Sequence, residues 1–336
     1  MKEKIKSIVP AWILFEIKNV IQSIELNYLY KNDKKRFKTY SANSKGNLSI
    51  GNVRSQVMYF SHQIEKGLSR KNFRYGFGLS AINNLVDALQ RMQHFPNYEN
   101  DDFYKTGISS LRAYSDRHRA KNEIIPNFEN IPDKLLHEIE HSTTENAGIV
   151  EITSRSKIDN SMINFKELAM RRTSIRDFKT DEHVDLDDLE EAIEICLKTP
   201  SVCNRQSSRV KIVTDKAKIE RILTLQRGFN GYELPDKLLL VTSDLSYFLR
   251  AQERNQGFID GGLFSMSLLY SLEYKSIGAC PLSANIGQTK VDEIRKILSI
   301  PESEILIMFI ACGIIDDKIT SPKSYRSPVN QITKVF

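Results

Sequence analysis

The sequence has no long hydrophobic run and no motif for export. None of its 336 residues belongs to a stretch of eighteen consecutive apolar side chains, so we expect no transmembrane helix. The apolar run that begins at Ala11 stops at Glu16 without a small-residue cleavage site, which argues against a secretory signal. The four cysteines are scattered and form no CxxC pair, as is typical of reduced thiols. We therefore expect a cytoplasmic protein.

Motifs of several enzyme classes are missing as well. The glycines form neither a G-x-G-x-x-G dinucleotide fingerprint nor a P-loop, and there is no H-E-x-x-H zinc helix or G-x-S-x-G elbow. Of the six histidines only His183 lies in the C-terminal half. No metal site is expected. No nucleic-acid partner is expected either, because the basic run over residues 31–36 lacks interleaved aromatic residues.

Positive charge is concentrated at the N-terminal end. Residues 1–100 carry 16 Lys and Arg against 7 Asp and Glu, whereas the remainder carries 32 against 35. The densest run, residues 31–36, has two interpretations. It is either a solvated linker or a segment that contacts an anionic surface, such as a membrane headgroup layer, or an anionic partner.

Hydrophobic periodicity divides the chain into two predicted domains. Residues 1–155 predict an all-helical N-terminal extension, with a polar linker over residues 31–50. In residues 156–336, β-like runs alternate with helical ones, which predicts an α+β domain. Its expected strands cover 210–213, 238–242 and 305–311, and its longest expected helix covers 257–274.

The stretch Arg171-Arg172-Thr173-Ser174-Ile175-Arg176-Asp177-Phe178 carries the clearest chemical signal. Three arginines and two hydroxyls fall within six residues. A planar guanidinium holds a phosphate through two parallel charge-assisted hydrogen bonds, and hydroxyls can bind the remaining oxygens. The stretch therefore suits a phosphorylated ligand. The alternative, favoured if the stretch stood alone, is a solvated basic turn after a helix.

Four later segments add weaker signals. They are Pro200–Gln206, Asp260-Gly261-Gly262, Ser276–Ser283 and Lys323–Pro328. The paired glycines stand inside an expected helix, where each costs about 1 kcal/mol relative to alanine, so they suggest close approach of a backbone or ligand. Taken singly, the glycine pair and Ser276–Ser283 are equally well explained as a helix break and a turn, while a turn and a basic tail are the better explanations of the other two segments.

In their order along residues 162–330, these segments resemble the nitroreductase-like FMN oxidoreductases. The stretch RRTSIRDF is similar to the family opening Arg-x-Ser-x-Arg/Lys-x-Phe, and PSVCNRQ is similar to Pro-Ser-x-x-Asn-x-Gln. Ser207-Ser208 stands where Pro-Trp is common in the family. The resemblance implies a mixed sheet flanked by helices, and it does not extend to residues 1–150.

The resemblance also implies a function. It implies an FMN-dependent oxidoreductase that reduces a small organic substrate, with NAD(P)H as donor, and a homodimer with FMN at the interface. Arg176 would act catalytically by placing a cation near the N1/O2 edge of the flavin. The implied cofactor-binding residues are Arg172, Thr173, Ser174, Arg176, Pro200, Ser201, Val202, Asn204, Asn230, Pro281, Leu282, Ser283, Lys323 and Arg326.

One alternative function stays open. The missing Pro-Trp and the helical extension also suit a flavin-binding or flavin-less scaffold whose basic extension binds a partner or an anionic surface. Within the extension, His62–Leu68 is the most distinctive segment, interpreted either as a helix surface with its cap or as a set of side chains facing a substrate. Yellow protein that NAD(P)H bleaches would favour the enzyme.

Overall fold

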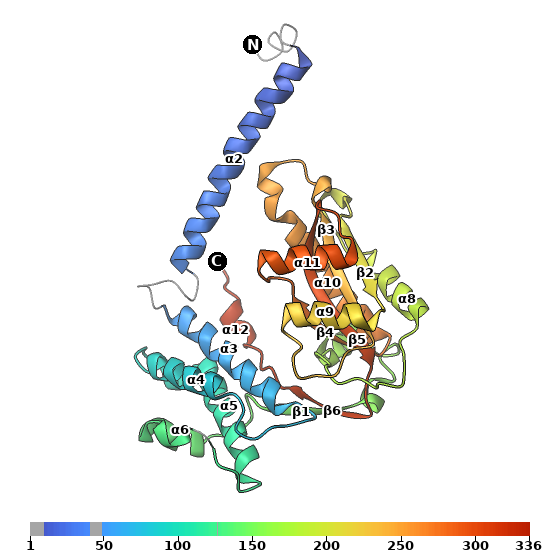
Figure 1. The fold of residues 1–336 in the computed structure, drawn as a ribbon. Helices are drawn as coiled ribbons and strands as arrows, with labels where there is room; N and C mark the ends of the chain where they lie inside the picture. The colour runs from blue at the N-terminus through green and yellow to red at the C-terminus, as the bar shows by residue number, and fades with distance from the viewer. Residues whose placement is uncertain (1–9, 41–48, 126) are drawn as a thin grey trace. The chain divides into compact units, whose positions relative to one another are not determined.

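The computed structural model describes residues 10–40, 49–125 and 127–336 (Figure 1). The chain forms two compact units. The first unit consists of Met1–Lys38 and Lys157–Ile315, and the second consists of Thr39–Ser156 and Asp316–Phe336. The predicted domain boundary between residues 155 and 156 stays a prediction. In these units the N-terminal segment belongs with the C-terminal half of the sequence, and the C-terminal segment belongs with the N-terminal half.

The second unit is helical with one small sheet. Its elements are α3 (Ile50–Leu68), α4 (Leu79–Met92), α5 (Asp102–Arg119), α6 (Asp133–Glu140), β1 (Ile149–Thr153), β6 (Lys318–Pro322) and α12 (Val329–Ile332). The β1 strand pairs antiparallel with β6, with Ile149 opposite Pro322. The N-terminal extension is therefore helical as predicted, except that its last residues before the boundary form β1 and pair with a strand more than 160 positions away.

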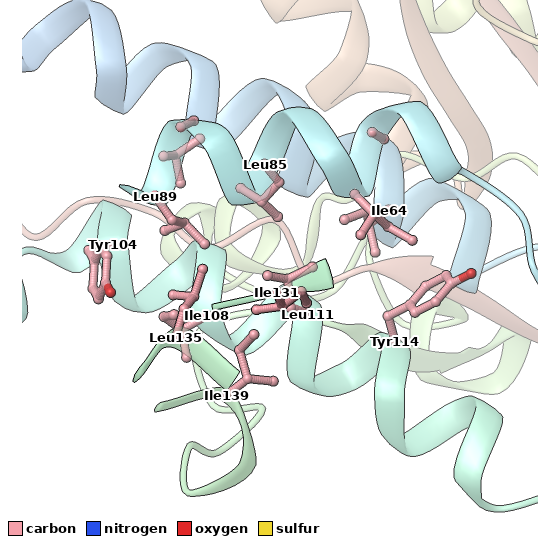
Figure 2. Packing of buried hydrophobic residues seen from close by; sticks show 14 of the residues in the cluster. Ile64, Leu85, Leu89, Tyr104, Ile108, Leu111, Tyr114, Ile131, Leu135 and Ile139 are labelled. Atoms are coloured by element: carbon pink, nitrogen blue, oxygen red, sulfur yellow. The ribbon is translucent and has the colours of Figure 1, made fainter. Parts of the chain in front are cut away.

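Helix caps and apolar stripes explain where these helices lie. The Asp101 side chain accepts a hydrogen bond from Phe103 N at 2.9 Å and so caps α5. Apolar residues at helical spacing face one core, which contains Ile64 of α3, Leu85 and Leu89 of α4, and Tyr114 of α5 (Figure 2). All four side chains are fully buried, which places the core of this unit between its helices.

The first unit is built on a four-stranded sheet. Its elements after residue 157 are α7 (Phe165–Arg171), α8 (Leu186–Cys196), β2 (Ser208–Val213), α9 (Lys216–Gln226), β3 (Lys237–Asp244), α10 (Gln256–Tyr274), β4 (Ile277–Ser283), α11 (Gln288–Leu298) and β5 (Glu304–Ile314). The strand order is β2-β3-β5-β4, and all three neighbouring pairs are antiparallel. The α+β fold class is confirmed, although the pairing within this sheet is antiparallel where a mixed sheet was expected.

Helix α10 packs on this sheet through one face. Its buried residues Phe264, Leu268 and Leu272 share a core with Leu239 of β3 and Ile310 of β5. Strands β3 and β5 are buried along most of their lengths, which explains their continuous apolar sequences.

Helix α2 (Ala11–Tyr40) is longer than predicted. Residues 31–40, expected as a linker, continue the helix, while residues 41–48 of that linker lie outside the described residues. The helix contacts the first unit near residues 249–254: Gln22 Nε2 donates to Leu249 O at 3.2 Å, and Asp33 accepts from Arg254 at 2.6 Å. Within the part of the chain that the structure describes, no helix has the length and apolar composition needed to cross a bilayer.

Candidate functional site

The arginine-rich stretch lies along the edge of the four-stranded sheet. Helix α7 is capped by the Asn164 side chain and ends at Arg171. The chain then runs beside β4, where Ile175 N donates to Ala279 O at 2.9 Å, and reaches the end of β5, where Lys179 N donates to Ile314 O at 2.9 Å. Main-chain hydrogen bonds at both ends therefore fix residues 172–178 against the sheet.

Two glycines make room for this stretch. A Cβ added at Gly313 would lie 2.9 Å from the Phe178 ring, and one at Gly278 would lie 3.1 Å from Ile175. Ile175 and Phe178 are both buried. Gly278 of the Ser276–Ser283 segment and Gly313 of β5 thus allow the two apolar side chains to anchor the arginine-rich stretch.

The polar side chains of the stretch are half-buried. Arg172, Thr173, Ser174 and Arg176 all have intermediate exposure. Arg176 Nη1 donates to Ser174 O at 3.3 Å, whereas Arg176 Nε is buried with no hydrogen-bond partner among the described residues. A buried donor without an acceptor is costly, so this guanidinium suits an acceptor supplied by a bound molecule.

A buried ion pair supports the stretch from behind. Lys157 and Glu273 form a salt bridge in which each side chain is 4 % exposed, and Lys157 Nζ also donates to Arg171 O at 3.0 Å. Asn160, fully buried, donates to Glu273 Oε1 at 3.1 Å. Burial lowers the pKa of Lys157, Glu273 opposes that shift, and Arg172 adds to it. This network holds the carbonyl group immediately before Arg172.

A second polar contact joins two of the predicted segments. The carboxylate of Asp260, on α10, accepts from Val202 N at 3.2 Å. Asp260 is buried. The loop around Val202 is unusual because Cys203 and Asn204 have φ values of +50° and +54°, in the left-handed region. One carboxylate therefore holds a strained loop that also carries Ser201.

The glycines beside Asp260 have different surroundings. A Cβ at Gly261 would lie 2.7 Å from Ile307 of β5, so this glycine permits close packing of α10 on the sheet. A Cβ at Gly262 would meet nothing within 4 Å. The outward side of α10 near Gly262 also carries Phe258, Ile259 and Leu263, each about half exposed.

An apolar groove continues along this side of α10. It has a volume of about 490 Å³ and is lined by Phe165 of α7, Ile195 of α8, Pro200, and Tyr270 and Tyr274 of α10. A smaller cavity of about 160 Å³ adjoins Pro200 and includes Ser201 and Asp260. Both hollows border the predicted Pro200–Asn204 segment.

The remaining candidates of the first unit lie near the arginine stretch. Phe229 is buried and stacks on Phe178 at a centroid distance of 6.5 Å, which anchors the loop that carries exposed Asn230. Pro281, Leu282 and Ser283 form the end of β4, the strand beside which Ile175 is bonded.

Lys323 and Arg326 belong to the second unit. Lys323 N donates to Gly148 O at 3.0 Å, and Lys323 Nζ donates to Thr144 O at 3.1 Å. The Arg326 guanidinium donates to Ser324 O. Their predicted contact with a phosphate stays a prediction.

Sequence reasoning missed the residues that position the site. Nothing marked Lys157, Asn160 or Glu273 as partners, because the ion pair joins residues separated by 116 positions. Asp260 was singled out by the neighbouring glycines, but its contact with Val202 was not expected.

Part of the chain is similar to known proteins. Residues 169–262 match the model of the nitroreductase family. A curated relative, "Putative NAD(P)H nitroreductase MhqN" of Bacillus subtilis, is 21 % identical over 208 residues, which is 52 % of this chain and 99 % of the relative.

Solved structures resemble the same half of the chain. A nitroreductase family protein from Clostridium difficile is 20 % identical, with a TM-score of 0.44, and the match covers 51 % of this chain and 98 % of that one. A protein from Exiguobacterium sibiricum, crystallised in complex with FMN, is 17 % identical, with a TM-score of 0.46 and coverage of 52 % and 98 %.

Proposed function

The chain contains a nitroreductase-family domain, and from this premise we propose that it is an FMN-dependent oxidoreductase acting on a small organic substrate. The family supports an oxidoreductase; FMN, NAD(P)H as donor and a cytoplasmic location are parts of the proposal. The observation that carries it is the buried, unpartnered Nε of Arg176 within an anchored cluster of arginines and hydroxyls.

FMN would find complementary groups in this cluster. Arg172 would bind the phosphate, and Thr173 and Ser174 would add hydroxyl donors. Val202 and Asn204, with Pro200 and Ser201, would contact the flavin from the loop held by Asp260. The end of β4, Pro281–Ser283, and Asn230 would border the ring. Lys323 and Arg326 remain further phosphate candidates from the sequence.

Bound FMN would supply hydride acceptance and donation, while the protein supplies binding and electrostatics. Arg176 would hold a fixed positive charge where negative charge develops on reduction, and a preorganised charge needs no rearrangement during the reaction. The apolar groove beside α10 would exclude water from an organic substrate. No side-chain acid or base is assigned.

We also propose a homodimer. The outward side of α10, with Phe258, Ile259 and Leu263 half exposed, has the apolar character of an oligomer interface. In a symmetric dimer the loop at Ser201 and Asn204 would reach the flavin bound by the partner.

Purified protein and two arginine variants test the enzyme proposal. We expect yellow protein that NADH or NADPH bleaches under anaerobic conditions. Arg172→Ala should weaken FMN binding by about 10- to 100-fold, because a charge-assisted pair is worth roughly 1.5–3 kcal/mol. Arg171→Ala is the matched control: this neighbouring guanidinium pairs with Asp159 at 2.6 Å, so FMN affinity should change less than about threefold.

Two results would contradict the proposal. Colourless protein that fails to take up added FMN would exclude a flavin enzyme. Equal loss of affinity in the Arg171 and Arg172 variants would remove the specific role of Arg172.

A second role is favoured by one observation. Helix α2 exposes apolar and basic side chains at the end of the chain where positive charge is concentrated. We propose that this helix attaches the protein to an anionic surface, whether or not the flavin domain is active.

A further inference from the structure

One long face of helix α2 combines exposed apolar and basic side chains. The residues Ile17, Val20, Ile21, Ile24, Tyr28, Lys31, Lys35 and Lys38 follow each other at helical spacing of three and four positions and form what we call the outer face. At about 100° per residue they fall within roughly a third of the helix circumference. The outer face is therefore apolar in its first half and basic in its second half.

Other sides of α2 make contacts within the first unit, and they also carry the exposed side chains of Phe15 and Phe37. Gln22 donates to Leu249 O, Glu25 accepts from Gln252, and Asp33 pairs with Arg254. Two acidic side chains of α2 are engaged in these contacts, whereas the residues of the outer face are all apolar or positively charged. The five apolar residues of the outer face are each at least half exposed, and its three lysines are exposed.

We propose that the outer face of α2 binds an anionic lipid bilayer, with the helix lying in the plane of the interface. The inference rests on the surface role proposed above and not on the flavin chemistry. Interfacial helices bury an apolar face at the headgroup boundary and gain further attraction between lysines and anionic lipids. Tyr28 stands where the apolar and basic halves meet, and tyrosine favours this boundary.

The length of the apolar half sets the mode of binding. From Ile17 to Tyr28 the helix rises about 16 Å, roughly half of the hydrocarbon thickness that a spanning helix must cross. The outer face therefore suits a surface location and not a crossing.

Other occupants fit this face less well. Pairing with α2 of a second copy would place lysines beside lysines if parallel, or against isoleucines if antiparallel, and both arrangements are unfavourable. A nucleic acid would satisfy Lys31, Lys35 and Lys38 but would leave the apolar half in water.

Vesicle flotation of the full-length protein tests the proposal. Vesicles of phosphatidylcholine alone are compared with vesicles that also contain phosphatidylglycerol, at low and at high salt. We expect co-flotation only with the anionic vesicles and a weaker signal at high salt. Lys31→Gln with Lys35→Gln should weaken binding by roughly 10- to 30-fold. The reason is that each lysine near an anionic membrane adds a comparable amount of binding free energy, and this pair of substitutions removes two such contributions.

Each half of the outer face has a matched control on the same helix. Lys18→Gln with Arg36→Gln removes the same charge from another side and should weaken binding at most a fewfold. Ile21→Ser with Ile24→Ser should abolish binding, whereas Phe15→Ser with Phe37→Ser, also at exposed positions, should keep it. Circular dichroism confirms that each variant is folded.

Three outcomes would overturn the inference. They are equal flotation with neutral and anionic vesicles, equal losses in the two lysine pairs, and self-association that Ile21→Ser with Ile24→Ser abolishes in the absence of lipid. Flavin content and bleaching are measured on the same samples, so failure of vesicle binding is separable from failure of the enzyme proposal.

Discussion

Glu65 shows how its surroundings set the chemistry of one side chain. It is 3 % exposed, and its carboxylate accepts from Gly148 N at 3.0 Å and from Ser324 N. Burial raises the pKa of Glu65 to about 7, while these hydrogen bonds and the charges of Arg326 and Lys323 oppose the shift. Glu65 thus joins α3 to the start of β1 and to the chain after β6.

The raised pKa predicts a pH-dependent stability. The folded protein binds the Glu65 proton more tightly than the unfolded chain, so its stabilising effect is complete below the usual pKa of about 4.5 and is lost as pH rises through about 7. The shift corresponds to at most about 3 kcal/mol. Urea unfolding at about pH 5 and about pH 8 should show the loss.

Glu65→Gln is the control for this titration. The amide cannot titrate, so the difference in stability between the two pH values should shrink in the variant. Identical pH profiles for both proteins would assign the dependence to other groups.

For Glu65 the sequence predicted the helical position of the residue but not its burial. It placed Glu65 on a helix with its cap inside His62–Leu68, and α3 ends at Leu68. The interpretation of the segment as a helix surface is wrong for Glu65, because its partners, Gly148 and Ser324, are too distant in sequence for helical periodicity to indicate them.

At the scale of elements, the contact between α10 and the loop at Val202 carries a prediction. Asp260→Ala removes the acceptor of the Val202 N–H, and an unpaired amide in a strained loop should exchange its proton faster. We expect about a tenfold or greater increase in exchange at Val202. Hydrogen exchange with mass spectrometry measures it.

Gln256→Ala is the matched control for this contact. Gln256 donates to the other Asp260 oxygen at 2.8 Å, so the variant keeps the bond to Val202. Unchanged exchange in both variants would show that Asp260 does not hold the loop.

Three of the four strands in the larger sheet were predicted, and the edge strand β2 is among them. Strands β3 and β5 lie inside the sheet and have continuous apolar sequences, so both were predicted. The edge strand β4 contains Gly278 and Pro281 and was interpreted only as a turn. Strands β1 and β6 form a two-stranded sheet. Their pairing could not be predicted, because no local sequence pattern links two strands so far apart in the chain.

At the scale of the whole molecule, the proposed dimer makes the outward side of α10 sensitive to charge. Leu263→Lys places an ammonium on this apolar surface, and we expect dissociation into monomers by analytical ultracentrifugation. Leu186→Lys is the matched control, because Leu186 on α8 is exposed to nearly the same extent, 49 % against 48 % for Leu263.

Flavin content of the separated species completes this test. If the partner supplies part of the flavin site, monomers of the Leu263 variant should lose FMN. A wild-type monomer that binds FMN would count decisively against a role for Ser201 and Asn204 across the interface.

The pairing of β1 with β6 has a consequence for biosynthesis. Residues 154–317 lie between these two strands in the sequence, as an insertion. A ribosome therefore translates residues 154–317 before β1 can pair with β6. A nascent chain arrested at residue 315 would contain the sequence of every strand of the four-stranded sheet, yet β1 would still lack its partner β6.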